Sequence, residues 1–326
     1  MSDRLKCAVV GCAWVGESHA EGYVRNKQAE LVAVCDVIPE AAERLAGRFG
    51  VPAFTSVEKM MEQTQPELVS VATSWDRHYE PTLKALQAGA HVLCEKPLAQ
   101  DSATAAKMVQ AAEEARRRLA VDFNYRFIYT TKQVRRLLQE GALGNLAYLY
   151  WRLTIGNPAD FNPYYHLVAL HTHSFDQAEY LGGRIRRLQA FMAKPSGRPH
   201  YTTCAINLEF GGECIGSIIG SYDMTFAQPI ARLEMGGTRG QVVVDDLVGE
   251  LRFLPHSTTQ CTEQVWRRRV MVRNDFVTTF YDRIDRFIEN ILRDEPTEAS
   301  GADGLRALEL VEAAIRSFET GQVVGV

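Results

Sequence analysis

The sequence lacks several features that are typical of particular protein classes. Its seven cysteines are scattered and odd in number, and no Cys-x-x-Cys pair occurs, which argues against a disulfide framework or a zinc site of that type. No run of about 18 apolar residues is present, so we expect no membrane span. The net charge of −4 offers no basic surface for nucleic acid. The first residues lack the apolar segment of a signal peptide, and we expect a cytoplasmic protein with reduced thiols.

The 326 residues, of which 46% are hydrophobic, are enough for two domains with ordinary cores. Residues 1–123 alternate strands with helices, which predicts a doubly wound parallel sheet of the Rossmann type. Its strands are expected at 7–10, 31–35, 51–54, 68–72, 91–94 and 119–123. Residues 124–326 contain runs of strands instead, which predicts an α+β domain with a large, mostly antiparallel open sheet.

The elements of this second domain follow from periodicity and turn residues. Strands are expected at 146–155, 186–192, 202–210, 213–222, 231–235 and 241–244, with weaker candidates at 251–253 and 264–272. Helices are expected at 131–139, 166–181, 276–292 and 304–319. The pair Gly211-Gly212 predicts a hairpin turn between two of the strands.

A dinucleotide-binding pattern begins at the first predicted strand. Gly11-Cys12-Ala13-Trp14-Val15-Gly16 follows this strand and opens a helix, with Ala13 in place of the usual second glycine. Asp36 ends the next strand, about 20 residues beyond Gly16, where an acid accepts hydrogen bonds from the adenosine ribose. Because this acid repels a 2′-phosphate and Val37–Pro39 supply no arginine, we predict NAD as the cofactor rather than NADP.

Two further strands end in polar residues at the predicted crevice. Thr73 and Ser74 follow the strand at 68–72, and Glu95-Lys96-Pro97 follow the strand at 91–94. The carboxyl ends of parallel strands open onto the ligand crevice. Lys96 could therefore donate a hydrogen bond to a reacting oxygen, with Glu95 orienting it. The sharp turn needed there makes Lys96–Pro97 a candidate for a cis peptide bond.

These motifs together resemble those of the Gfo/Idh/MocA oxidoreductase family over nearly the whole chain. The markers are the 11–16 loop, Thr73-Ser74, His78, 91–99, 123–127, 140–144 and 303–308. The resemblance implies an NAD(P)-dependent oxidoreductase that acts on a secondary alcohol of a sugar, polyol or inositol-like substrate. It also implies a homodimer or homotetramer formed through the open C-terminal sheet.

The resemblance and the motifs together give a set of candidate site residues. Lys96 and His173 are the candidate catalytic residues, acting on one substrate oxygen with His173 as the base. Candidate cofactor-binding residues are Gly11, Ala13, Trp14, Val15, Gly16, Asp36, Thr73, Ser74, His78, Glu95, Lys96 and Asn124. Candidate substrate-binding residues are Lys96, Tyr125, Arg126, Arg152, Tyr165, His166 and His173.

The sequence departs from the family pattern at Ala13 and at Ala169, which stands where an acid usually precedes the histidine by one helical turn. Asp176 shares a face with His173 and is either its orienting partner or a cap for local backbone groups. We expect no metal site, because His171 and His173 point in different directions on a helix. Two alternative functions stay open: an NAD-dependent glycosidase that oxidises its sugar transiently, and a non-catalytic protein that senses dinucleotide.

Overall fold

The computed structural model describes residues 4–225, 229–257, 262–267 and 275–326. It divides into two compact units. The first comprises residues 1–124 and 276–308, and the second comprises residues 125–275 and 309–326. The sequence placed everything after residue 123 in one domain, and the structure differs because residues 276–308 pack with the first unit.

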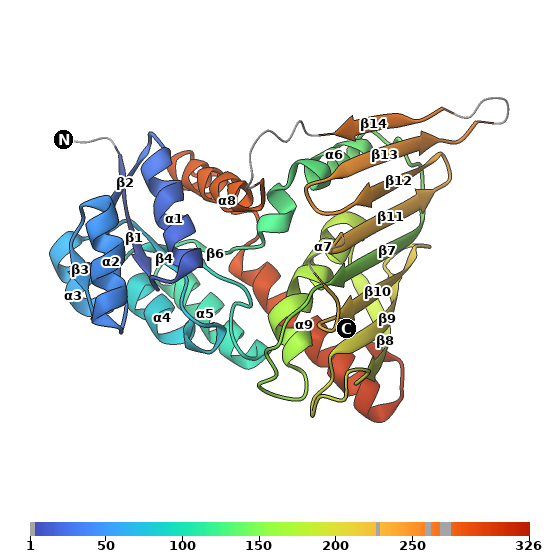
Figure 1. Cartoon of the computed structure of the whole chain (residues 1–326). Helices are drawn as coiled ribbons and strands as arrows, with labels where there is room; N and C mark the ends of the chain where they lie inside the picture. Colours follow the sequence, from blue (N-terminus) through green and yellow to red (C-terminus); the bar gives the residue numbers. More distant parts are fainter. Residues whose placement is uncertain (1–3, 226–228, 258–261, 268–274) are drawn as a thin grey trace. The chain divides into compact units, whose positions relative to one another are not determined.

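The first unit contains a six-stranded sheet in the order β3-β2-β1-β4-β5-β6, with every neighbouring pair parallel. The strands are β1 (Leu5–Val10), β2 (Ala29–Cys35), β3 (Ala53–Phe54), β4 (Leu68–Val71), β5 (His91–Cys94) and β6 (Leu119–Val121). The helices between them are α1 (Trp14–Arg25), α2 (Pro39–Phe49), α3 (Val57–Thr64), α4 (Tyr79–Gln87) and α5 (Ser102–Glu114). The predicted doubly wound sheet is confirmed (Figure 1).

Local sequence explains where several of these helices begin. Ser56 and Asp101 each accept a hydrogen bond from a backbone N–H in the first turn of α3 and α5, as expected of helix-capping side chains. Helix α8 (Asp275–Leu292) completes the core of this unit. Its residues Ile284, Phe287 and Ile288 are fully buried and pack with strand residues such as Val9.

The second unit contains a nine-stranded, mostly antiparallel sheet in the order β14-β13-β12-β11-β7-β10-β9-β8-β15. Its strands are β7 (Leu146–Thr154), β8 (Ile185–Ala193), β9 (Thr203–Phe210), β10 (Ile215–Ser221), β11 (Ala231–Gly237), β12 (Gly240–Asp245), β13 (Glu250–Pro255), β14 (Gln264–Arg267) and β15 (Val324–Gly325). The pairing of β9 with β10 confirms the predicted hairpin at 211–212. The part of the predicted strand beyond residue 267 lies outside the described residues.

The helices of the second unit lie against one face of its sheet (Figure 1). They are α6 (Tyr129–Gln139), α7 (Thr172–Gly182) and the second half of α9 (Gly301–Thr320). A segment of π-helix, η3 (Leu167–His171), leads directly into α7. The sequence predicted one regular helix over 166–181, and this wider turn is the correction that matters most below.

Candidate functional site

The glycine loop after β1 packs closely against neighbouring backbone at its two glycines. Gly11 has a positive φ of 99°, and a Cβ there would lie 2.4 Å from the Ala72 carbonyl oxygen. A Cβ on Gly16 would lie 1.8 Å from the Gly11 carbonyl oxygen. Ala13 has an ordinary extended backbone, with φ −78°, so its methyl group fits without strain. Among the described residues no side chain caps α1 at Ala13, and its first N–H groups are available to an anion.

Asp36 lies at the end of β2 and is connected to this loop. Its carboxylate accepts hydrogen bonds from the backbone N–H groups of Cys12, at 2.7 Å, and Ile38, at 3.0 Å. The residues directly after Asp36 supply no basic side chain, but one reaches the loop from α2. Arg44, on α2, donates a hydrogen bond to the Cys12 carbonyl oxygen at 2.7 Å, so a positive charge also lies at this loop.

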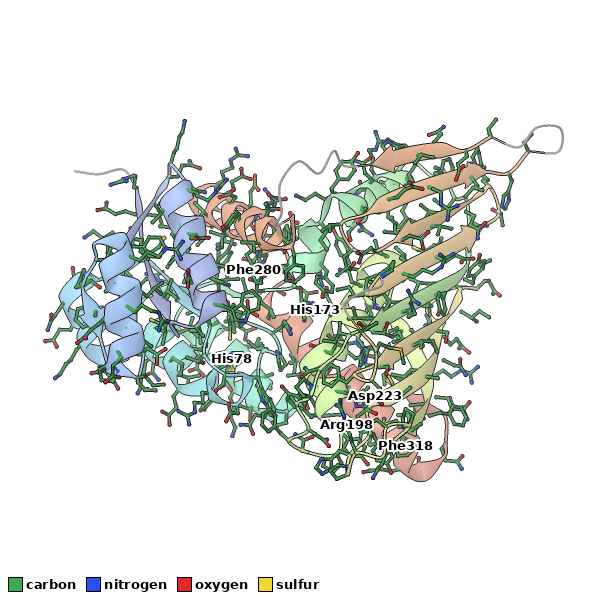
Figure 2. All side chains as sticks on the ribbon, viewed as in Figure 1. His78, His173, Arg198, Asp223, Phe280 and Phe318 are labelled. Carbon is green, nitrogen blue, oxygen red and sulfur yellow. The ribbon has the colours of Figure 1, made fainter. Side chains whose placement is uncertain are left out.

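His78 connects the end of β4 to the turn after β5. Its Nδ1 lies 2.8 Å from the Pro97 carbonyl oxygen, and its Nε2 lies 3.2 Å from the Thr73 carbonyl oxygen. Burial lowers the pKa of His78, while the hydrogen bonds to the Pro97 and Thr73 carbonyl oxygens oppose that shift. Figure 2 shows His78 in the first unit.

The polar atoms at these strand ends fit a bound dinucleotide. The Thr73 hydroxyl is buried and has no hydrogen-bond partner in the described part of the chain. An unpaired buried hydroxyl is costly, and a ligand could supply the missing partner. Together with the uncapped start of α1 and the carboxylate of Asp36, this hydroxyl makes the first unit suitable for NAD.

The turn after β5 places a carboxylate and an amine next to each other. The Lys96–Pro97 peptide bond is cis, which confirms the prediction. The Glu95 carboxylate accepts a hydrogen bond from the Lys96 backbone N–H at 3.1 Å. Burial lowers the pKa of Lys96, while the charges of Glu95 and Asp122 oppose that shift.

A buried polar network, which no sequence pattern predicted, contacts Glu95. His19, on α1, has its Nε2 atom 3.2 Å from Glu95 Oε1 and 3.1 Å from Asp122 Oδ2. Its Nδ1 atom lies 2.8 Å from the Ser70 hydroxyl, which also bonds the Tyr23 hydroxyl at 2.6 Å. Burial lowers the pKa of His19, but the hydrogen bonds to Asp122 and Glu95 outweigh it and raise that pKa to about 9. Because both ring nitrogens are engaged, we interpret this group as a hydrogen-bonded network rather than a metal site.

His173 belongs to the second unit, in the first turn of α7 (Figure 2). It is 4% exposed. The ring of Tyr125 stacks on its imidazole, with ring centroids 4.0 Å apart and an angle of 8° between the planes. The two residues are thus held face to face, and the stacking fixes the plane of the imidazole although Ala169 supplies no acid.

Asp176 has a partner that the sequence did not suggest. Its two carboxylate oxygens each lie 3.0 Å from Nε of Arg126, and the Arg126 guanidinium also packs over the Tyr180 ring. Arg126 therefore forms a buried ion pair with Asp176, next to the stacked pair of Tyr125 and His173. Its predicted contact with substrate stays a prediction.

The remaining predicted residues lie in several environments. Asn124 donates a hydrogen bond to the Thr279 hydroxyl at 2.7 Å, and Arg152 donates one to the Pro229 carbonyl oxygen at 3.2 Å. Tyr165 contacts the edge of the Phe161 ring. His166 is 1% exposed and lies beside His171, with ring centroids 5.7 Å apart. The predicted cofactor- and substrate-binding roles of these residues stay predictions.

Comparison with known proteins connects both units to one family. Residues 5–123 match the model described as "Oxidoreductase family, NAD-binding Rossmann fold", and residues 135–326 match that of its C-terminal alpha/beta domain. The chain is 26% identical to the myo-inositol 2-dehydrogenase of Thermotoga maritima, over 97% of this chain and 96% of that protein. It is 37% identical to the D-glucoside 3-dehydrogenase of Escherichia coli, over 44% of this chain and 42% of that protein.

Solved structures show the same fold. A levoglucosan dehydrogenase in complex with NADH and L-sorbose superposes with a TM-score of 0.90 at 19% identity, covering 99% of each chain. No helix within the described ranges is both long enough and apolar enough to span a membrane. The resemblance seen in the sequence is therefore confirmed: this chain belongs to the Gfo/Idh/MocA oxidoreductase family and carries its NAD-binding Rossmann domain.

Proposed function

We propose that this chain is an NAD-dependent dehydrogenase that oxidises a secondary alcohol of a sugar, polyol or inositol-like substrate. The observation that carries the proposal is the placement of Lys96. It follows β5 at the carboxyl end of the parallel sheet, where the glycine loop and Asp36 also lie, and burial lowers its pKa. Glu95, whose carboxylate contacts the buried His19, directly precedes this lysine, and a cis peptide bond joins the lysine to Pro97.

The roles of the residues follow from the chemistry of alcohol oxidation. NAD, when bound, accepts the hydride. The ammonium group of Lys96 donates a hydrogen bond to the substrate oxygen and stabilises the negative charge that develops on it. His173, whose imidazole stacks on the Tyr125 ring, accepts the hydroxyl proton of the substrate. Glu95, which accepts a hydrogen bond from the Lys96 N–H and contacts His19, holds its carboxyl group beside the lysine.

The substrate class is supported by the relatives. Inositol 2-dehydrogenases from Thermotoga maritima and Rhizobium meliloti match 96% and 99% of their own lengths, and the D-glucoside 3-dehydrogenase of Escherichia coli matches over a shorter region. The names of these three proteins describe oxidation of a ring carbon that bears a hydroxyl group. We propose the same kind of carbon as the reacting centre here.

The experiment is a screen for NADH formation across inositols, aldoses and alkyl glucosides, with the Lys96→Ala variant measured beside the wild type. We expect NADH from at least one cyclic polyol or sugar, and its loss in the variant. Release of free sugar from a glycoside without net NADH would indicate the glycosidase instead. Binding of NAD with no turnover of any substrate would contradict the proposal and favour the sensing function.

The same proposal extends to assembly and location. The nine-stranded sheet carries exposed apolar side chains, including Phe191 on β8 at 57% and Ile215 on β10 at 61% exposure, and we propose this sheet as the surface of a homodimer or homotetramer. All six cysteines that the structure describes are free thiols, in keeping with the cytoplasm. Light scattering coupled to gel filtration, on the wild type and on a Phe191→Glu variant, tests the assembly.

A further inference from the structure

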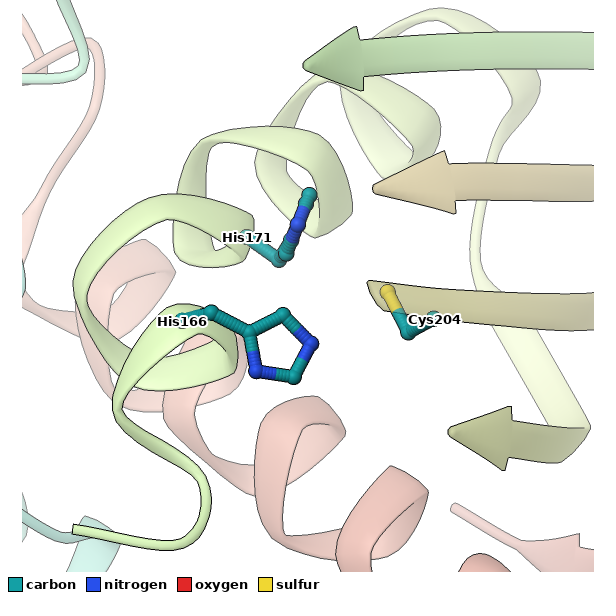
Figure 3. Close-up of side chains that lie close together, drawn as sticks. All are labelled: His166, His171 and Cys204. Atoms are coloured by element: carbon teal, nitrogen blue, oxygen red, sulfur yellow. The ribbon is translucent and has the colours of Figure 1, made fainter. Parts of the chain in front are cut away.

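We propose that His166, His171 and Cys204 form a buried binding site for a thiophilic d¹⁰ cation, Zn²⁺ or Cu⁺. Each residue contributes one ligand atom, and the three atoms lie within 4.8 Å of one another. Figure 3 shows the two imidazole rings and the thiol facing the same space. The site shares His166 with the candidate substrate-binding residues but includes neither Lys96 nor His173, and the proposal does not depend on the function proposed above.

The π-helix brings the two histidines together. In a regular α-helix with 3.6 residues per turn, residues five apart lie on different faces. His166 immediately precedes the π-helix Leu167–His171, and His171 ends it. A π-helix forms hydrogen bonds between residues i and i+5, so its wider turn brings residues five apart closer to one face than an α-helix does, and such turns occur frequently at functional sites. The sequence predicted no metal site here because it assumed the α-helical period.

Cys204 comes from β9, opposite the π-helix, and Gly220 on β10 leaves the space that the ligand atoms occupy. A Cβ on Gly220 would lie 2.0 Å from His171 Nε2 and 2.9 Å from Cys204 Sγ. Gly220 and Cys204 are paired across the two strands. The sheet therefore supplies the third ligand and, through a glycine, the room for the imidazole beside it.

The ligand atoms are buried and available. His166 is 1%, His171 0% and Cys204 2% exposed. Neither nitrogen of His166, nor Nε2 of His171, has a hydrogen-bond partner among the residues that the structure describes. Unpaired buried polar atoms cost free energy and require an explanation. A cation bound between them would satisfy these nitrogens.

The Nδ1 atom of His171 has a hydrogen-bond partner, as the second ring nitrogen of a histidine has in many metal sites. Nδ1 lies 2.9 Å from the Ser174 hydroxyl, and the indole N–H of Trp151 donates to the same hydroxyl at 3.0 Å. If Nδ1–H donates to Ser174, the lone pair of Nε2 points toward Cys204. Metal-binding histidines commonly donate their second N–H in this way, which fixes the tautomer and the orientation of the ring.

The donor set selects the class of cation. Two imidazoles and a thiolate suit Zn²⁺ or Cu⁺ rather than Mg²⁺ or Ca²⁺, which prefer oxygen. In a tetrahedral zinc site the ligand atoms are roughly 3.6 Å apart, so shifts of about 1 Å would bring these three into range.

The test measures metal on the intact protein. Wild type, Cys204→Ser and His171→Ala are incubated separately with Zn²⁺ and, under reducing conditions, with Cu⁺, passed through gel filtration and analysed by mass spectrometry for metals. Cys214→Ser is the matched control, since Cys214 is also a buried free thiol of the second unit. We expect stoichiometric metal in the wild type and the control, and trace metal in the other two.

Two further readouts apply even if a variant folds poorly. Substitution with Co²⁺ should give a thiolate-to-metal charge-transfer band in the wild type and in Cys214→Ser. The Ser174→Ala variant, which lacks the hydroxyl beside Nδ1 of His171, should bind metal about 10–100-fold more weakly. In the wild type and in Cys214→Ser, addition of Zn²⁺ should raise the Tm and a chelator should lower it. A wild type that retains no zinc or copper, or metal retained equally in Cys204→Ser and His171→Ala, would overturn the proposal.

Discussion

In the first unit His19 is completely buried with both ring nitrogens engaged, whereas in the second unit His166 is almost as buried but has no described partner on either nitrogen. The surroundings explain the difference. Asp122 and Glu95 face His19 and raise its pKa to about 9, whereas burial dominates at His166 and lowers its pKa to about 4. Burial alone therefore does not determine the pKa of a histidine, because charged neighbours can outweigh it.

The two histidines also belong to buried polar groups of two different kinds. In the network of His19, Glu95 and Asp122 both ring nitrogens of the histidine have partners, so this histidine needs no further ligand, and Glu95 also accepts a hydrogen bond from the Lys96 backbone N–H. The group of His166, His171 and Cys204 is incomplete, so it requires a ligand or carries an energetic cost. Four predictions test this contrast, beginning with the residue that the first network supports.

Replacing Lys96 should have the largest effect. Lys96→Ala should lower kcat by about 10²–10⁴-fold with little change in NAD affinity, because a contact to the substrate oxygen in the transition state is lost. Steady-state kinetics with the substrate found in the screen, together with NAD titration, measure both quantities. Lys107→Ala, an exposed lysine on α5, is the control. Unchanged turnover in Lys96→Ala would show that the first network supports no catalytic lysine.

Replacing His173 tests the histidine of the second unit that is the candidate base and lies outside the proposed metal site. His173→Ala should lower kcat by about 10²–10³-fold if it accepts the substrate proton. His200→Ala serves as the control, because His200 pairs with Asp160 elsewhere in the same unit. If His173→Ala retains nearly full turnover while Lys96→Ala is inactive, the lysine alone handles the proton and His173 serves packing against Tyr125.

The pH dependence of stability tests the charge on His19. A histidine whose pKa is raised from 6.5 to about 9 stabilises the folded state fully below pH 6.5, and this contribution is lost as the pH rises through 9. The wild type should lose up to about 3 kcal/mol of unfolding free energy over that interval. Urea unfolding at a series of pH values measures it. In His19→Gln the fall should be absent; an identical profile for both proteins would show that His19 is neutral.

Cofactor choice should show the smallest effect. We expect kcat/KM with NAD to exceed that with NADP by about 10–100-fold, or roughly 1.4–2.8 kcal/mol, because Asp36 repels a 2′-phosphate. Arg44 opposes this preference, so Arg44→Ala should reduce NADP use by up to about 5-fold. Arg48→Ala, on the same helix but paired with Glu17 and Glu21, is the control. Equal or better use of NADP by the wild type would refute the prediction.

The sequence by itself determined the two sheet types, most element positions and the residues at the ends of β1, β2, β4 and β5. These features depend on local periodicity, on turn residues and on the rule that ligands bind at the carboxyl ends of parallel strands. The cis bond at Lys96–Pro97 was also predicted correctly, because a short motif fixes the direction of the chain there. The same kind of information identified the family.

Only the tertiary structure decided which distant side chains meet. His19 and Asp122 are far apart in the sequence and come together through the packing of α1 against the sheet. The pairing of Arg126 with Asp176 and the attachment of residues 276–308 to the first unit likewise depend on long-range packing. His166, His171 and Cys204 required two conditions that periodicity does not report: a π-turn in place of an α-turn, and a strand from elsewhere in the chain that brings a thiol to it.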